Sequence, residues 1–142
     1  WLPLFYIPER AKSVWGDDMA AGEAKRSADL APLDVVAGGL VAIGEDAAKV
    51  AELARPMVAL YVGGMGAKGR NFYNDLVRRY GFEAEAEKIQ DLYLAGKKQE
   101  AEAAVPEELL RSISLIGPES HVRERIAAYR EAGVTTLTIT PQ

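Results

Sequence analysis

Residues 117–141 read GPESHVRERIAAYREAGVTTLTITP, and this stretch decides the fold class. Pro118 suits the first position of a helix, because the N–H that proline lacks would be unpaired there. Apolar residues then recur at helical spacing, and Gly133 is typical of a helix end. Residues 135–140 are almost all β-branched, as in a central strand. The stretch therefore predicts one helix followed by one buried strand, which is typical of an α/β fold.

The sequence before this stretch predicts further strands and helices in alternation. Residues 1–7 are apolar and fit a strand end, Pro8 opens a helix to about residue 26, and residues 35–43 form a second strand with a bend at Gly38-Gly39. Glu45 and Asp46 favour the start of a long helix with a kink at Pro56. The predicted buried face of that helix comprises Val50, Leu53, Ala54, Met57, Val58 and Tyr61.

Shorter helices are predicted over residues 71–80, 83–95 and 106–112, followed by a brief extended link at residues 113–116. Asn71 is a suitable N-cap for the first of these helices, and Gly81 a suitable end. Alternating strands and helices indicate a parallel sheet with covering helices. Three such apolar strands require burial on both faces and leave two open sheet edges.

Composition excludes several classes of function. The 142 residues carry a net charge of −4 with basic and acidic residues intermixed, so no basic face for nucleic acid is expected. There is no Cys, which removes disulfides and thiolate chemistry. No apolar run is long enough to cross a bilayer, so we expect no membrane partner. With no secretory signal visible we expect a cytoplasmic protein, and the start at Trp1 instead of Met indicates that upstream sequence is missing.

No single motif identifies a reaction. The glycines from Gly63 to Gly69 lack the Lys-Ser/Thr pair of a nucleotide loop and follow a helix, so a helix end with a connector is the better interpretation. His121 is the only histidine, and we expect no metal site. Trp1, Phe5 and Tyr6 lie where a strand gives way to a loop, which is where α/β folds build sites. An aromatic plug under the next helix explains them equally well.

Several segments together resemble a known family. The chain is similar to the C-terminal part of the luciferase-like (LLM class) oxidoreductases of the coenzyme F420-dependent branch, in segments 1–6, 55–66, 71–75, 88–96, 105–109 and 117–141. The resemblance implies the C-terminal part of a (βα)₈ TIM barrel that extends over residues 1–142. Residues 1–6 would continue its sixth strand, 35–43 the seventh and 134–140 the eighth, with a helical insertion at about 66–116 before the last strand.

The resemblance also implies a function. The complete enzyme would transfer hydride between the reduced deazaflavin F420 and a small organic substrate. The cofactor would be bound mainly by an N-terminal part that is missing here, so this fragment would be inactive alone, and no catalytic residue is assigned. Leu4, Phe5 and Tyr6 would shape the substrate pocket, and Arg70 and Asn71 would roof it. Two alternatives stay open: an FMN-dependent monooxygenase fragment, or a non-catalytic assembly module that forms a homo-oligomer or pairs with the remainder of a barrel.

Overall fold

The sheet has three parallel strands in the order β2-β1-β3. The computed structural model describes residues 1–44 and 48–142. Strand β1 (Val36–Ile43) is central, and it pairs with β2 (Leu115–Gly117) and with β3 (Thr136–Pro141). A Cβ atom at Gly38 would lie 1.8 Å from the carbonyl oxygen of Thr138, so glycine permits this close approach of β1 and β3. The predicted α/β class and parallel sheet are confirmed.

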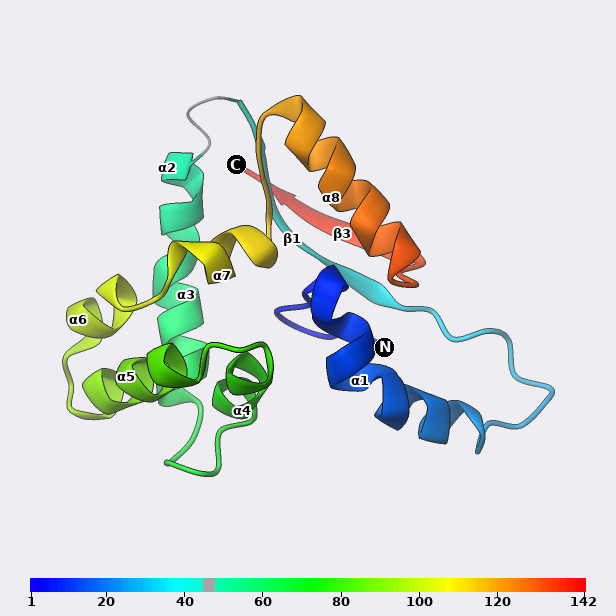
Figure 1. The fold of residues 1–142 in the computed structure, drawn as a ribbon, viewed down its shortest axis with the longest axis horizontal. Coiled ribbons are helices and arrows are strands. Elements are labelled where there is room, and N and C mark those ends of the chain that lie inside the picture. The colour runs from blue at the N-terminus through cyan, green and yellow to red at the C-terminus, as the bar shows by residue number, and fades with distance from the viewer. Residues whose placement is uncertain (45–47) are drawn as a thin grey trace.

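One face of the sheet is covered by α8 (Glu119–Glu131), with α1 (Pro8–Glu23) packed beside it (Figure 1). We call the buried cluster between them the sheet core, and it contains Tyr6, Ala11, Ala37, Leu115, Val122 and Tyr129. Hydrogen bonds of Tyr6 and Tyr129 attach the N-terminal segment to α8 and to the residue that follows it. The hydroxyl of Tyr129 donates to the carbonyl of Tyr6 at 3.2 Å, and the hydroxyl of Tyr6 donates to the carbonyl of Ala132 at 3.0 Å.

Residues 48–112 are almost wholly helical and form a second group, which we call the helical body (Figure 1). Its own buried cluster includes Phe5, Val58, Val62, Leu76, Val77, Ile89 and Leu109. Its elements are α2 (Ala48–Ala51), the 3₁₀-helix η1 (Glu52–Ala54), α3 (Arg55–Ala59), the π-helix η2 (Leu60–Gly64), α4 (Phe72–Arg79), α5 (Glu83–Leu94), α6 (Lys98–Ala103) and α7 (Glu107–Ser112).

The long predicted helix is interrupted in the turn before Pro56, as expected, but its buried face is narrower than predicted. Val58 and Ala54 are buried, whereas Leu53 and Met57 are exposed. The helical stretch ends at Gly64, so the run of glycines from Gly63 terminates it as predicted. A Cβ at Gly63 would lie 2.5 Å from the Cβ of Tyr93, so this glycine allows α5 to pack closely on η2.

The N-terminal segment differs from its prediction. Residues 1–7 form no strand, although the carbonyl of Trp1 accepts a hydrogen bond of 2.8 Å from the N–H of Val36 at the start of β1. Pro3 has no N–H to continue such a ladder, and the backbone at Phe5 has φ 58°, which turns the chain away. The third strand of the sheet is instead β2, in the segment predicted as an extended link.

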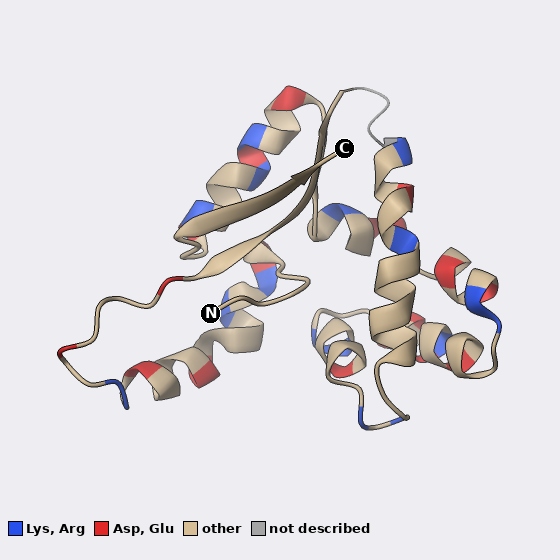
Figure 2. Cartoon of the chain, turned by 180° about the vertical axis from the view of Figure 1, so that it is seen from behind, with Lys and Arg blue, Asp and Glu red and all other residues tan. Residues whose placement is uncertain are grey.

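The carboxyl ends of β1 and β2 are hydrogen-bonded to each other. The N–H of Gly44, directly after β1, donates to the carbonyl of Gly117, at the end of β2, at 3.0 Å. The predicted helix start at Glu45 and Asp46 lies outside the described residues. Basic and acidic residues alternate over the helices (Figure 2), and no helix in the described part of the chain is long and apolar enough to span a membrane.

Candidate functional site

Phe5 and Tyr6 are consecutive residues whose side chains enter different cores. Both are buried, Phe5 in the helical body and Tyr6 in the sheet core, while Leu4 remains 37 % exposed. Phe5 is the one non-glycine residue with positive φ in the described ranges, 1–44 and 48–142. A left-handed backbone at an aromatic residue is strained, and such strain is concentrated at functional sites.

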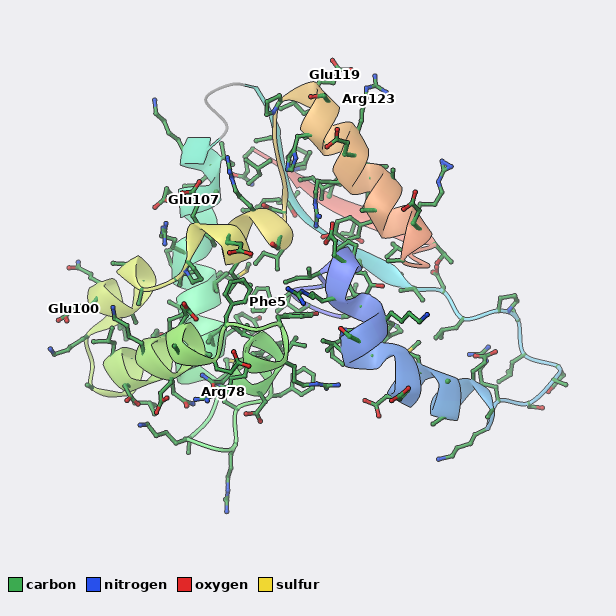
Figure 3. The ribbon with its side chains drawn as sticks, in the orientation of Figure 1. Phe5, Arg78, Glu100, Glu107, Glu119 and Arg123 are labelled. Carbon is green, nitrogen blue, oxygen red and sulfur yellow. The ribbon has the colours of Figure 1, made fainter. Side chains whose placement is uncertain are left out.

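The ring of Phe5 meets two tyrosines of the helical body. Its centroid lies 5.7 Å from that of Tyr61 and 5.9 Å from that of Tyr73, and the two tyrosine rings are 4.8 Å apart. All three pairs are edge-to-face, the geometry that the charge distribution of aromatic rings favours. We call Phe5, Tyr61 and Tyr73 the aromatic cluster. Figure 3 shows Phe5, at the turn of the N-terminal segment, beside the helical body.

The side chain of Asn71 hydrogen-bonds to the backbone of both tyrosines of the aromatic cluster. Its Oδ1 accepts hydrogen bonds from the N–H groups of Tyr73 and Asn74, at 3.0 and 3.2 Å, and so caps α4. Its Nδ2 donates to the carbonyls of Tyr61 and Val62 in η2, at 2.9 and 3.0 Å. A π-helix leaves carbonyls without the usual i+4 partner, and this amide satisfies two of them. Asn71 therefore positions both tyrosines, and its amide is fully engaged in doing so.

Asn74 extends the same buried network. Its Nδ2 donates to the carbonyls of Val62 and Ala86 at 3.0 and 2.7 Å, which ties η2 to α5. Its Oδ1 accepts a bond of 2.8 Å from Nε of Arg78, which is labelled in Figure 3. Arg70, by contrast, is exposed and lies outside this network. Of the five predicted pocket residues, the structure brings Phe5 and Asn71 to the same pair of tyrosines, Tyr61 and Tyr73, whereas Tyr6 lies in the sheet core and Leu4 and Arg70 are exposed.

Comparison with known proteins identifies the family. The family model described as "Luciferase-like monooxygenase" matches residues 1–136. The chain belongs to the luciferase-like family. It is 36 % identical over 143 aligned positions to the "Putative coenzyme F420-dependent oxidoreductase Rv3520c" of Mycobacterium tuberculosis, covering 99 % of this chain and 41 % of the relative.

A solved structure agrees with this assignment. The coenzyme F420-dependent tetrahydromethanopterin reductase of Methanopyrus kandleri superposes with a TM-score of 0.65 at 25 % identity. The match covers 99 % of this chain and 38 % of the reductase. The luciferase-like chain thus has the fold of part of a TIM barrel and spans about two fifths of the length of these relatives. Its relatives place it in a family of oxidoreductases.

One cavity among the described residues lies at the end of the sheet opposite to the one where α/β folds build sites. The aromatic cluster is filled by its own rings. The cavity, of about 590 Å³ and lined by Trp1, Tyr6, Trp15 and Val35 among others, lies between α1 and α8 at the start of β1. Sites in α/β folds form at the opposite ends of the strands, beyond Ile43, Gly117 and Pro141. No step of cofactor chemistry is therefore assigned to residues of this luciferase-like chain.

Sequence reasoning missed the two tyrosines and Asn74. Tyr61 was predicted only as part of the buried face of the long helix. Tyr73 lies two residues after the N-cap Asn71, where no sequence pattern indicates a site. Tyr61 and Tyr73 meet Phe5 because of the π-helix η2 and the positive φ of Phe5, and the sequence predicts neither. His121 packs against Gly117, where a Cβ would lie 3.0 Å from its Cδ2. Among residues 1–44 and 48–142, no group of three potential ligands is placed to hold a metal ion.

Proposed function

We propose that this chain is the substrate-side portion of an F420-dependent oxidoreductase, which transfers hydride between reduced F420 and a small organic substrate. The family membership and the F420 dependence named for both relatives support the reaction class. In such enzymes the cofactor supplies the hydride chemistry, and the protein orients the substrate and excludes water. One observation carries the assignment of this portion: the aromatic cluster, built on a strained Phe5 and fixed by Asn71.

The aromatic cluster would form one wall of the substrate pocket. Tyr61 and Tyr73 are half-buried, so each retains surface that a substrate could contact, and Leu4 adds an exposed aliphatic side chain. The second wall and the deazaflavin site would come from the part of the enzyme that this chain does not cover. The chain alone would then be inactive. We also keep Arg70 as a residue that approaches the substrate from the loop before α4.

A chimera tests this proposal. The part of the M. tuberculosis relative outside the aligned 41 % is joined to this chain, and the chimera and the chain alone are titrated with oxidised F420 and, separately, with FMN. Visible absorbance reports binding. We expect the chimera to bind F420 and the chain alone to bind neither cofactor.

The outcomes separate the alternatives. Binding of FMN in place of F420 by the chimera would favour the flavin-dependent monooxygenase, a reading that the description of the family model supports. Full-strength F420 binding by the 142-residue chain would contradict its inactivity alone. In an active chimera, Tyr61→Leu should raise KM for the organic substrate and leave the F420 affinity unchanged, and Leu94→Lys, at an exposed residue at the end of α5, serves as the control.

A further inference from the structure

The cavity between α1 and α8 is large enough to hold a small molecule. Its volume of about 590 Å³ lies within the range of ligand sites in proteins. Helix α1 contributes Ala11, Trp15 and Met19 to the lining, at intervals of four residues, so one face of that helix borders the cavity. Trp1 and Tyr6 line it from the N-terminal segment. The cavity therefore has three aromatic residues around it, at the start of β1.

These three aromatic rings are set nearly at right angles to one another. The ring centroid of Trp1 lies 5.3 Å from that of Trp15, with 73° between the planes, and 6.1 Å from that of Tyr6, with 80° between the planes. The face of an aromatic ring attracts a cation, and tryptophan does so most strongly. Trp15 already shows this property, because the guanidinium carbon of Arg79, a residue that does not line the cavity, lies 5.8 Å from its ring centroid.

The charges around the cavity also favour a cation. Among the described residues that line it, Glu9 and Glu131 are acidic and Lys12 is basic. Glu9 accepts a hydrogen bond from Arg125, which balances its charge within the protein, so Glu131 is the carboxylate that offsets Lys12. The cavity also borders Ala132 at the C-terminal end of α8, where the helix dipole is negative and stabilises positive charge.

We propose that this cavity binds a small quaternary ammonium compound. The methyl groups of such a cation pack against Trp1, Tyr6 and Trp15, and its charge lies near Glu131 and the end of α8. A quaternary ammonium ion donates no N–H hydrogen bond, so it suits a cavity walled mainly by rings. The site lies at the start of β1 and is independent of the hydride transfer proposed above.

Choline is the probe for the test, and 3,3-dimethylbutan-1-ol is the comparison because it has the same shape without the charge. The chain contains 2 tryptophans, Trp1 and Trp15, and both line the cavity, so tryptophan fluorescence reports directly on its occupancy. We expect choline to change this fluorescence saturably, with a dissociation constant about tenfold or more below that of the alcohol. Absence of saturable choline binding, or equal binding of the two compounds, overturns the proposal.

Three variants of exposed charged residues locate the site. We expect Glu131→Gln to weaken choline binding about twofold or more, and Lys12→Gln to strengthen it by a similar factor. Neither variant should change binding of the uncharged alcohol. Glu124→Gln is the matched control, because Glu124 is exposed on the same helix as Glu131 and does not line the cavity. Equal effects of Glu131→Gln and Glu124→Gln would show a response to net charge alone and contradict the proposal.

A fourth variant removes one aromatic wall. Trp15→Leu leaves Trp1 as the fluorescent reporter, and we expect it to weaken choline binding about tenfold or more. Circular dichroism establishes that the variant is folded. Unchanged choline affinity in the folded variant would overturn the proposal, and if Trp15→Leu fails to fold, the charge variants decide.

Discussion

At the scale of single residues, Phe5 combines a strained backbone with a well-packed ring. Its φ of 58° costs a non-glycine residue about 1 to 2 kcal/mol. Phe5→Gly and Phe5→Ala both remove the ring, but only glycine also removes the strain. We therefore expect Phe5→Gly to be more stable than Phe5→Ala by about 1 kcal/mol, the reverse of the order in a helix or strand. Urea unfolding measures the difference, and a more stable alanine variant would contradict it.

Tyr129 gives a prediction about alkaline pH. Burial raises the pKa of Tyr129 to about 12, from 10.0, while nearby Arg125 partly opposes that shift. The raised pKa means that the folded state holds the phenol proton more tightly. The corresponding stability is complete below about pH 10 and is lost as the pH rises towards 12.

We expect the free energy of unfolding to fall between pH 10 and about pH 11.5, and Tyr129→Phe to lessen that fall by up to about 2 kcal/mol. Urea unfolding at each pH measures the free energy of unfolding of the unmodified protein and of the Tyr129→Phe variant. Burial also raises the pKa of Tyr6 and Tyr80, and these two residues titrate in both proteins. Parallel pH profiles for the two proteins would show that the Tyr129 phenol is not the cause.

The role of a residue was predictable where it depends only on that residue and its neighbours in the sequence. Asn71 was predicted as an N-cap from its type and its place before a helical pattern, and its Oδ1 does cap α4. Its donation to η2 was not predictable, because nothing in the sequence marks residues 60–64 as a π-helix. The positive φ of Phe5 has no sequence signal, since phenylalanine rarely adopts it.

At the scale of elements, the packing of η2 on α5 depends on Gly63. A methyl group there would lie 2.5 Å from the Cβ of Tyr93 and 3.1 Å from the carbonyl of Ile89. We expect Gly63→Ala to destabilise the protein by about 1 to 3 kcal/mol through overpacking. Gly16→Ala in α1 is the matched control, because its nearest neighbour would be 3.7 Å away. The control should stabilise by up to about 1 kcal/mol, and thermal unfolding compares the two; equal effects would exclude overpacking.

Helix ends were predicted more accurately than strands. Gly81, Gly96 and Gly133 all have positive φ after helices that end where expected. Strand β2 was missed because it has three residues and is defined by its pairing with β1, which sequence does not display. Leu53 and Met57 fit the spacing of a buried helical face, but the 3₁₀ turn of η1 rotates that face and leaves them exposed.

At the scale of the whole molecule, we expect the two hydrophobic cores to unfold as two cooperative units. Val77 is buried in the helical body and Val122 in the sheet core. We expect Val77→Ala to accelerate hydrogen exchange mainly in residues 55–112, and Val122→Ala mainly in α8 and the strands. Each substitution should cost about 1 to 3 kcal/mol. Uniform acceleration over the chain by either variant would show a single cooperative unit.

The parallel direction of the strands was predictable from the alternation of elements, and the family from the segments that resemble it. The place of the N-terminal segment was not. Its apolar residues suit a strand, yet they serve instead to connect the two cores through Phe5 and Tyr6.

The hydrogen bond between Gly44 and Gly117 has a consequence for how such proteins diverge. It holds the carboxyl ends of β1 and β2 together, so the register of these two strands is fixed while the residues that connect them can lengthen, shorten or be exchanged. A lineage could therefore acquire a new helical body in a single recombination event. Exchange of the segment before α1 would be harder to tolerate, because Phe5 packs in the core of the helical body and Tyr6 packs in the sheet core.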